Sequence, residues 1–134
     1  MNQYFLHARM CTGAEHHERW RKIRKESIDE MKHADELIER VLFLDGLPNV
    51  QRLGKVNIGT SVAEILKNDL GAEMLAIPLL NRSIQMCRDR RGQRLEHLLK
   101  ILVSEEEHVD WLEAQLELIK QVGEQNYLAQ QIRD

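Results

Sequence analysis

Apolar residues recur every three or four positions along most of the chain, which is the spacing of helices with one buried face. This period predicts helices over residues 1–11, 14–44, 61–89, 93–122 and 124–133. Breaker residues separate them, with a long crossover over residues 45–60 and shorter breaks elsewhere. Short outer connections and a long middle one predict an all-α four-helix bundle with a short fifth helix. We expect residues 1–134 to form a single domain.

The first predicted helix is much shorter than the next three. At about 1.5 Å per residue it spans less than half their length, so we expect a truncated first helix. Thr60 or Ser61 is expected to cap the helix over residues 61–89. Glu64, three residues after Ser61, is the matching partner of a capping box.

Each of the three long helices carries one carboxylate in an otherwise apolar seam: Glu30, Glu73 and Glu105. A lone carboxylate in such a seam costs several kcal/mol unless a positive group compensates it. His33 and His108 each follow a seam glutamate by three residues, so both side chains of each pair share one helix face. The pattern favours a shared metal ion over solvated surface groups, and the ligand types suit non-haem iron, zinc or manganese.

Composition narrows the functional classes. The chain has a formal net charge of −3, which argues against a nucleic-acid partner. No apolar run approaches the length of a membrane span, and no signal peptide is evident, so we expect no membrane partner. Two cysteines, Cys11 and Cys87, indicate a reducing cytoplasm and are interpreted as core residues.

The remaining histidines lack a seam carboxylate at this spacing, and we interpret them as surface or interface residues: His7, His16, His17 and His97. Tyr4 lies on the bundle-facing side of the first segment, where it is placed to hydrogen-bond a metal centre or accept an electron. The basic run over residues 19–25 is interpreted as a solvated or subunit-contact face.

Several segments together resemble bacterioferritin, a ferritin-like family, over nearly the whole chain. They are residues 2–10 (NQYFLHARM), 26–35 (ESIDEMKHAD), 38–49, 53–59, 105–113 and 123–128. The resemblance implies a hollow octahedral cage of identical subunits. It also implies a ferroxidase that oxidises ferrous iron at a di-iron centre inside each subunit and stores the ferric mineral.

Carried over residue by residue, the resemblance implies that Glu30 and Glu105 bridge two irons, with His33, His108 and Glu73 as terminal ligands. The family's sixth ligand corresponds to a position before Met1. Haem b is implied between two subunits, with one methionine from each, and that methionine matches Met31. From the residues alone, packing is the favoured interpretation of Met31.

One family feature is altered here. The inner-surface iron site of the family pairs an aspartate, here Asp29, with a histidine, and this chain has Lys25 at the histidine position.

A second hypothesis is a structural or haem-carrying cage subunit with an incomplete or slow di-iron site. Such a subunit would assemble with a full-length paralogue that performs the oxidation. For the first hypothesis, a ferredoxin-type reductant is the expected protein partner.

Overall fold

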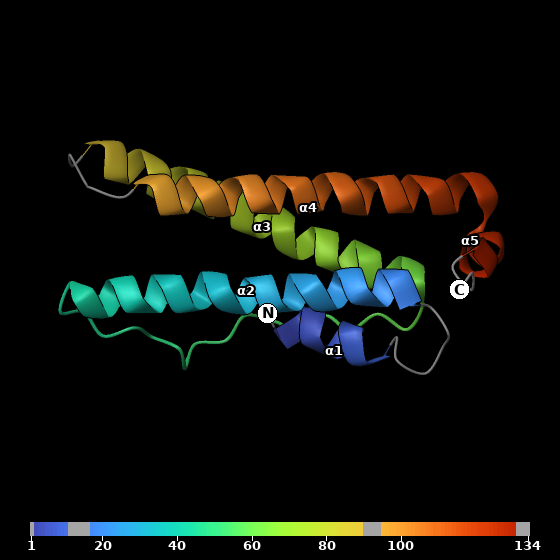
Figure 1. The fold of residues 1–134 in the computed structure, drawn as a ribbon, viewed down its shortest axis with the longest axis horizontal. Coiled ribbons are helices and arrows are strands. Elements are labelled where there is room, and N and C mark those ends of the chain that lie inside the picture. The colour runs from blue at the N-terminus through green and yellow to red at the C-terminus, as the bar shows by residue number, and fades with distance from the viewer. Residues whose placement is uncertain (1, 11–16, 90–94, 131–134) are drawn as a thin grey trace. The chain divides into compact units, whose positions relative to one another are not determined.

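The described residues of the computed structural model, 2–10, 17–89 and 95–130, are helical apart from the crossover segment (Figure 1). The helices are α1 (Asn2–Met10), α2 (His17–Phe43), α3 (Val62–Asp89), α4 (Leu95–Val122) and α5 (Glu124–Gln130). No strand occurs in these ranges, and the predicted all-α class is confirmed. No helix within them is long and apolar enough to cross a membrane. Predictions for Cys11, His16 and the helix ends at 14, 93 and 133 fall outside the described residues.

The chain forms two compact units: Met1–Ile58 with the segment from Leu128, and Gly59–Tyr127. In the first, α1 runs antiparallel to α2 and packs along its first half (Figure 1). Tyr4 and Ile23 are buried, in keeping with the inward side predicted for Tyr4. The backbone N–H of Asn57 donates to Gln3 Oε1 at 3.0 Å, which fastens the end of the crossover to α1.

His7 corrects one sequence interpretation. It is fully buried in α1, with a relative exposure of 0%, whereas the sequence placed it at a surface or interface. The error has a simple reason: on a short helix that packs closely against a longer one, a residue without a seam partner can still face the neighbouring helix. His97, by contrast, is exposed on α4 as expected.

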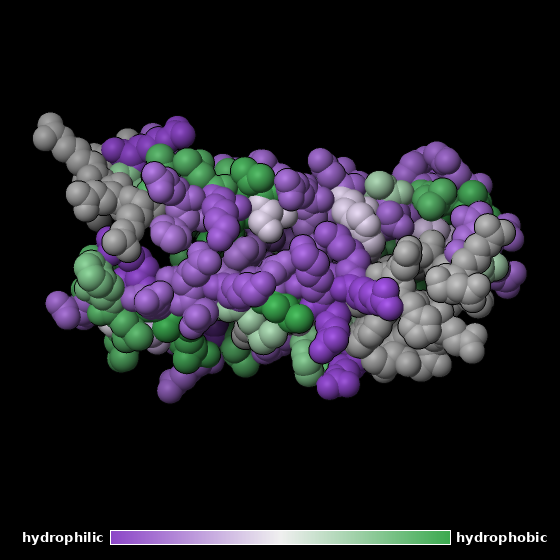
Figure 2. Space-filling view, in the orientation of Figure 1, coloured by the Kyte–Doolittle hydropathy of each residue, from purple (hydrophilic) through white to green (hydrophobic). Residues whose placement is uncertain are grey.

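The second half of α2 is largely exposed despite its apolar seam. Leu37, Val41 and Phe43 are exposed by 41%, 36% and 70%. The exposed apolar side chains continue through Leu44 into the crossover at Leu47. Figure 2 shows apolar atoms over this end of α2 and the crossover. This end of α2 and the crossover therefore present an extended apolar surface.

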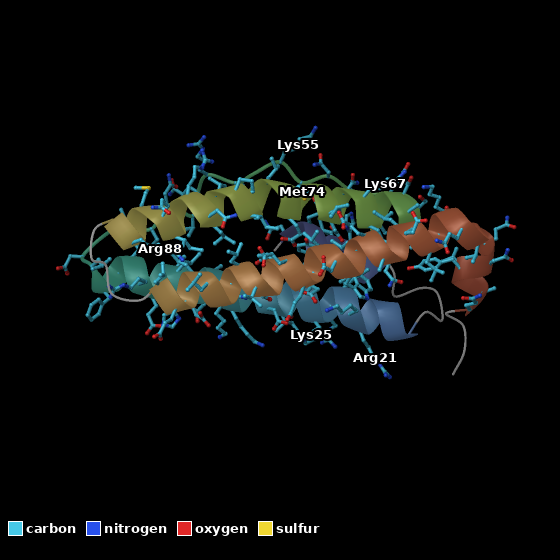
Figure 3. The ribbon with its side chains drawn as sticks, turned by 90° about the horizontal axis from the view of Figure 1, so that it is seen from above. Arg21, Lys25, Lys55, Lys67, Met74 and Arg88 are labelled. Atoms are coloured by element: carbon cyan, nitrogen blue, oxygen red, sulfur yellow. The ribbon has the colours of Figure 1, made fainter. Side chains whose placement is uncertain are left out.

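In the second unit, α3 and α4 form an antiparallel hairpin (Figure 1). The apolar seams predicted for these two helices form their inward faces, because every seam residue of α3 and α4 is buried or half-buried. Leu66 and Leu112 are almost completely buried, with exposures of 0% and 1%. The outward side of α3 is marked by the exposed Met74 (Figure 3).

Ser61 caps the N-terminus of α3, as one of the two residues expected there. Its hydroxyl accepts a hydrogen bond from the Glu64 N–H at 3.2 Å. Glu64 reaches back one residue further than in the usual capping box, to the backbone N–H and hydroxyl of Thr60 at 2.8 and 2.6 Å. The hydrogen bond from the Thr60 hydroxyl is the largest of the effects that lower the pKa of Glu64. The ionised Glu64 carboxylate therefore stabilises the folded protein at neutral pH, and this contribution is lost as the pH falls through the lowered pKa of Glu64.

The C-terminal end of α4 turns sharply into α5 at Gly123, which has a φ of 79°. In this left-handed conformation Gly123 donates its N–H to the carbonyl oxygen of Ile119 at 2.8 Å. Tyr127 of α5 is fully buried and donates its hydroxyl to Gln115 of α4 at 2.7 Å. These contacts dock the start of α5 onto α4.

Candidate metal centre

The α3–α4 hairpin brings three buried ionisable side chains to one place: Glu73 of α3, with Glu105 and His108 of α4. Each offers a ligand atom, and these atoms all lie within 4.8 Å of one another. Their exposures are 2%, 5% and 3%. This is the spacing at which one or two cations can be shared by the three groups.

Local helix geometry explains why these side chains meet. Glu105 and His108 are three residues apart on α4, so they project from one face. Leu112, one turn later, continues this face and is buried. Glu73 lies on α3 in the row that contains Leu66, so the pairing of the two seams directs it toward α4.

The electrostatics of this group favour a cation. Two carboxylates at close range in a buried site repel each other and lose their hydration. His108 Nδ1 lies 3.0 Å from Glu73 Oε1, within hydrogen-bonding distance. The imidazole also stacks on Trp111, with ring centroids 6.2 Å apart and an interplanar angle of 24°. The site thus combines oxygen and nitrogen ligands with a restrained ring, which suits a transition metal.

Glu30 and His33 form a second group on α2, in the other unit. His33 Nδ1 lies 3.6 Å from Glu30 Oε1, and the two side chains are 15% and 25% exposed, respectively. The i, i+3 spacing expected from the sequence therefore does place the carboxylate and the imidazole together. The predicted ligands thus form two groups, a pair on α2 and a triad between α3 and α4.

At the position of the family's inner-surface iron site, where the sequence replaces the histidine by Lys25, Asp29 forms ion pairs with two lysines. Lys25 Nζ lies 3.3 Å from Asp29 Oδ2, and Lys32 Nζ lies 2.9 Å from Asp29 Oδ1. Partial burial raises the pKa of Asp29, but hydrogen bonds from Lys32 and Lys25 outweigh it and hold that pKa below its usual range. The lysine at the family's histidine position thus supplies a positive charge to Asp29 directly.

Met31 follows Glu30 and lies about 100° further around α2. It is 43% exposed and lines a groove between α1 and α2. Met31 therefore belongs to a different surface of the unit than the Glu30–His33 pair.

One buried acid on α3 was not predicted from the sequence. Asp69 is 1% exposed and lies one turn before Glu73 on α3. Asp69 was not assigned to the buried face of α3, because its neighbour Leu70 already occupies the apolar position of the helical repeat. The i, i+4 separation from Glu73 was the available signal.

Comparison with known proteins finds ferritin-like relatives over nearly the whole chain. The family model of the ferritin-like domain matches residues 1–122. The bacterioferritin BfrA of Mycobacterium tuberculosis (strain ATCC 25618 / H37Rv) is 45% identical over 131 residues, which cover 97% of this chain and 82% of the relative. A bacterioferritin of Streptomyces coelicolor is 44% identical over 134 residues, with coverages of 96% and 78%. One from Brucella melitensis biotype 1 is 40% identical over 129 residues, with coverages of 95% and 80%.

Proposed function

Because this chain belongs to the bacterioferritins of the ferritin-like family, we propose that it oxidises ferrous iron and stores the ferric product in a hollow cage of identical subunits. The observation that carries the proposal is the buried triad of Glu73, Glu105 and His108. Buried carboxylates of this kind need a compensating cation, and a binding site for ferrous iron gives them one.

In this proposal the Glu30–His33 pair and the triad contribute to one di-iron centre within the subunit. Di-iron bundles use a Glu-x-x-His motif from each of two helices and a single glutamate from each of the others. Glu30 with His33 supplies one motif, Glu105 with His108 the second, and Glu73 one single glutamate. Glu30 and Glu105 are the proposed bridging ligands, and the other three are terminal.

The protein's own contribution is binding and charge compensation. The carboxylates offset the charge of two ferrous ions, and the histidines bind as neutral imidazoles. The Glu73–His108 hydrogen bond then gives way to contacts with the substrate iron. Each ferrous ion loses one electron, and the oxidant, oxygen or peroxide, takes up the pair. The ferric product moves into the cage, from which a ferredoxin-type reductant would later release it.

We further propose that haem b is shared between two subunits through Met31. The thioether of Met31 would hold the haem iron, and the groove beside it has a volume of about 380 Å³. Ser27 Oγ, on the same wall, is buried and has no hydrogen-bond partner within the described residues, as expected where a ligand completes the site. When bound, haem supplies electron transfer. Family membership and the low cysteine count support a cytoplasmic location.

Ferrous oxidation by the assembled protein tests the main proposal. We expect two irons per chain and rapid oxidation, and we expect Glu105→Gln to slow the oxidation by about 100-fold or more, because second-shell changes alone cost about 10- to 100-fold. Glu107→Gln is the matched control, since it removes the same charge from an exposed position of α4. Equal rates for the two variants would show that the triad does not bind the substrate iron.

A second candidate function is the structural or haem-carrying subunit, including one that assembles with a full-length paralogue. It is favoured by one observation: α1 carries no acidic residue within Asn2–Met10, so the described α1 supplies no carboxylate to the centre. Haem absorbance with one or no non-haem metal per chain, and slow ferrous oxidation, would support this candidate over the ferroxidase.

A further inference from the structure

The outward side of α3 carries a row of exposed side chains. Its members are Leu75, Leu79, Arg82 and Met86, which follow one another at intervals of four, three and four residues and therefore lie along one line of the helix. The three apolar residues are exposed by 75%, 57% and 56%, and Arg82 is exposed as well. Apolar rows of this kind on a protein surface mark contacts with another molecule. We call this row the α3 face.

The α3 face is positively charged. Arg82 lies one turn from Leu79 on one side and one turn from Met86 on the other, so apolar side chains flank its guanidinium group. The nearest acids before it on α3, Asp69 and Glu73, are buried and do not belong to this face. A partner for the α3 face therefore needs an exposed acid with apolar side chains beside it.

The last turns of α2 carry that arrangement. Glu39 is exposed, and Leu42 and Phe43, one turn later on the same side of the helix, are exposed by 54% and 70%. We call these three residues the α2 face. Four acids and one arginine lie between residues 35 and 47, and the arginine is half-buried. The α2 face thus has an acid beside apolar surface, where the α3 face has a base.

A closed cage needs a contact between two different faces of the subunit. Two chains that share one haem form a symmetrical pair, which uses the same face twice and ends with two chains. A contact between different faces leaves each copy with one face still to be used, so it can continue until a ring closes. The α2 and α3 faces are different, and both are exposed in this chain.

We propose that the α3 face of one subunit packs on the α2 face of a second copy of this chain, with Arg82 opposite Glu39. This inference rests on the cage of the proposed function and adds which two faces meet. The apolar residues of the two faces then cover one another and are removed from water. The charge pair fixes the register and disfavours the pairing of either face with itself, because like charges would then meet.

Charge reversal tests the pairing. Arg82→Glu should raise the protein concentration at which half of the chains are assembled by about 10-fold or more, because like charges then meet across the contact. Glu39→Arg should do the same. Assembly is measured by size-exclusion chromatography with light scattering over a dilution series. Arg88→Glu is the matched control with unchanged assembly, because Arg88 is exposed on α3 but lies about 120° around the helix from Arg82.

The double variant Arg82→Glu/Glu39→Arg should recover most of the lost assembly, because opposite charges face each other again. The two single variants are also dissociated, mixed in equal amounts and reassembled. The mixture should form larger species than either variant alone, since each reversed α3 face can meet a reversed α2 face on another chain. Recovery in neither sample, or in the double variant only, would overturn the inference.

Leu79→Asn provides a second variant, which removes apolar surface without a change of charge. It should also shift the assembly toward smaller species, with an unchanged helix content by far-UV circular dichroism, because Leu79 is exposed. A parent protein that does not assemble would overturn both the cage and the inference. Assembly of Arg82→Glu at the same concentrations as the parent would overturn the inference alone and leave the cage in place. Ferrous oxidation within the subunit is measured separately.

Discussion

The Glu73–His108 hydrogen bond joins two side chains that are only 3% and 4% exposed. At this depth a charge without a partner is far more costly than at the surface, because water no longer solvates it. The metal-free protein therefore depends on the imidazole to compensate the carboxylate. Where iron binds, the same atoms serve as ligands instead.

Replacing His108 by leucine should destabilise the metal-free protein by about 3 kcal/mol, because the buried Glu73 carboxylate loses its hydrogen bond with the imidazole. Urea unfolding after chelation of metal measures the effect. His97→Leu is the control: His97 is exposed on the same helix, so its removal should change the free energy of unfolding by about 0.5 kcal/mol or less.

The double variant Glu73→Leu/His108→Leu separates this explanation from a simple loss of packing. Removing both polar partners takes the Glu73 carboxylate out of the buried site, so part of the lost stability should return, while the buried Glu105 carboxylate remains. A double variant that is less stable than His108→Leu alone would contradict a desolvated charge pair at this position.

Among the elements, the turn between α4 and α5 depends on one backbone conformation. Gly123 has a φ of 79°, which residues with a side chain adopt at a cost of about 1 to 2 kcal/mol. A Cβ added at Gly123 would meet no atom within 4 Å, so sterically there is room for it. Any loss of stability on substitution of Gly123 is therefore due to its backbone conformation and not to a steric clash.

Gly123→Ala should destabilise the protein by about 1 kcal/mol, measured by thermal or urea unfolding. Gly71 supplies the matched comparison, because it also has open space around it but lies inside α3 with helical geometry. Gly71→Ala should stabilise the protein by about 0.5 to 1 kcal/mol. Effects of the same sign in both variants would refute the conformational argument.

The element order and the fold class were predictable from the sequence. The 3.6-residue period and the breakers at the crossover and at Gly123 are local features, and family membership confirms the ferritin-like class. The burial of His7 was not predictable in the same way. On a nine-residue helix the apolar period is too short to define one face, so packing against α2 decides which residues are covered.

At the scale of the whole molecule, the first unit carries an extended apolar surface at the end of α2 and along the crossover. Its members include Phe43, Leu44, Leu47, Val50 and Leu53, all exposed by 61% or more. Apolar surfaces of this extent mark protein–protein contacts. We expect this surface to be a contact between subunits in the proposed cage.

Phe43→Glu should therefore shift the assembly toward smaller species, as measured by size-exclusion chromatography with light scattering. The subunit itself should stay folded, because Arg40, whose guanidinium carbon lies 4.9 Å from the Phe43 ring centroid, can pair with the new carboxylate. Gln51→Glu adds the same charge at an exposed crossover position without removing apolar surface. Assemblies of unchanged size in both variants would show that this surface is not a subunit contact.

The sequence by itself determined the helical class, the carboxylates within the seams and the two Glu-x-x-His pairs. These features depend on spacing along a single helix, which the order of residues fixes directly. Only the tertiary structure decided that Glu73 meets Glu105 and His108 within 4.8 Å. It also decided that Asp69 of α3 is buried and that two arginines line the groove at Met31. Those arrangements require contacts between helices, and the packing and direction of neighbouring helices determine them.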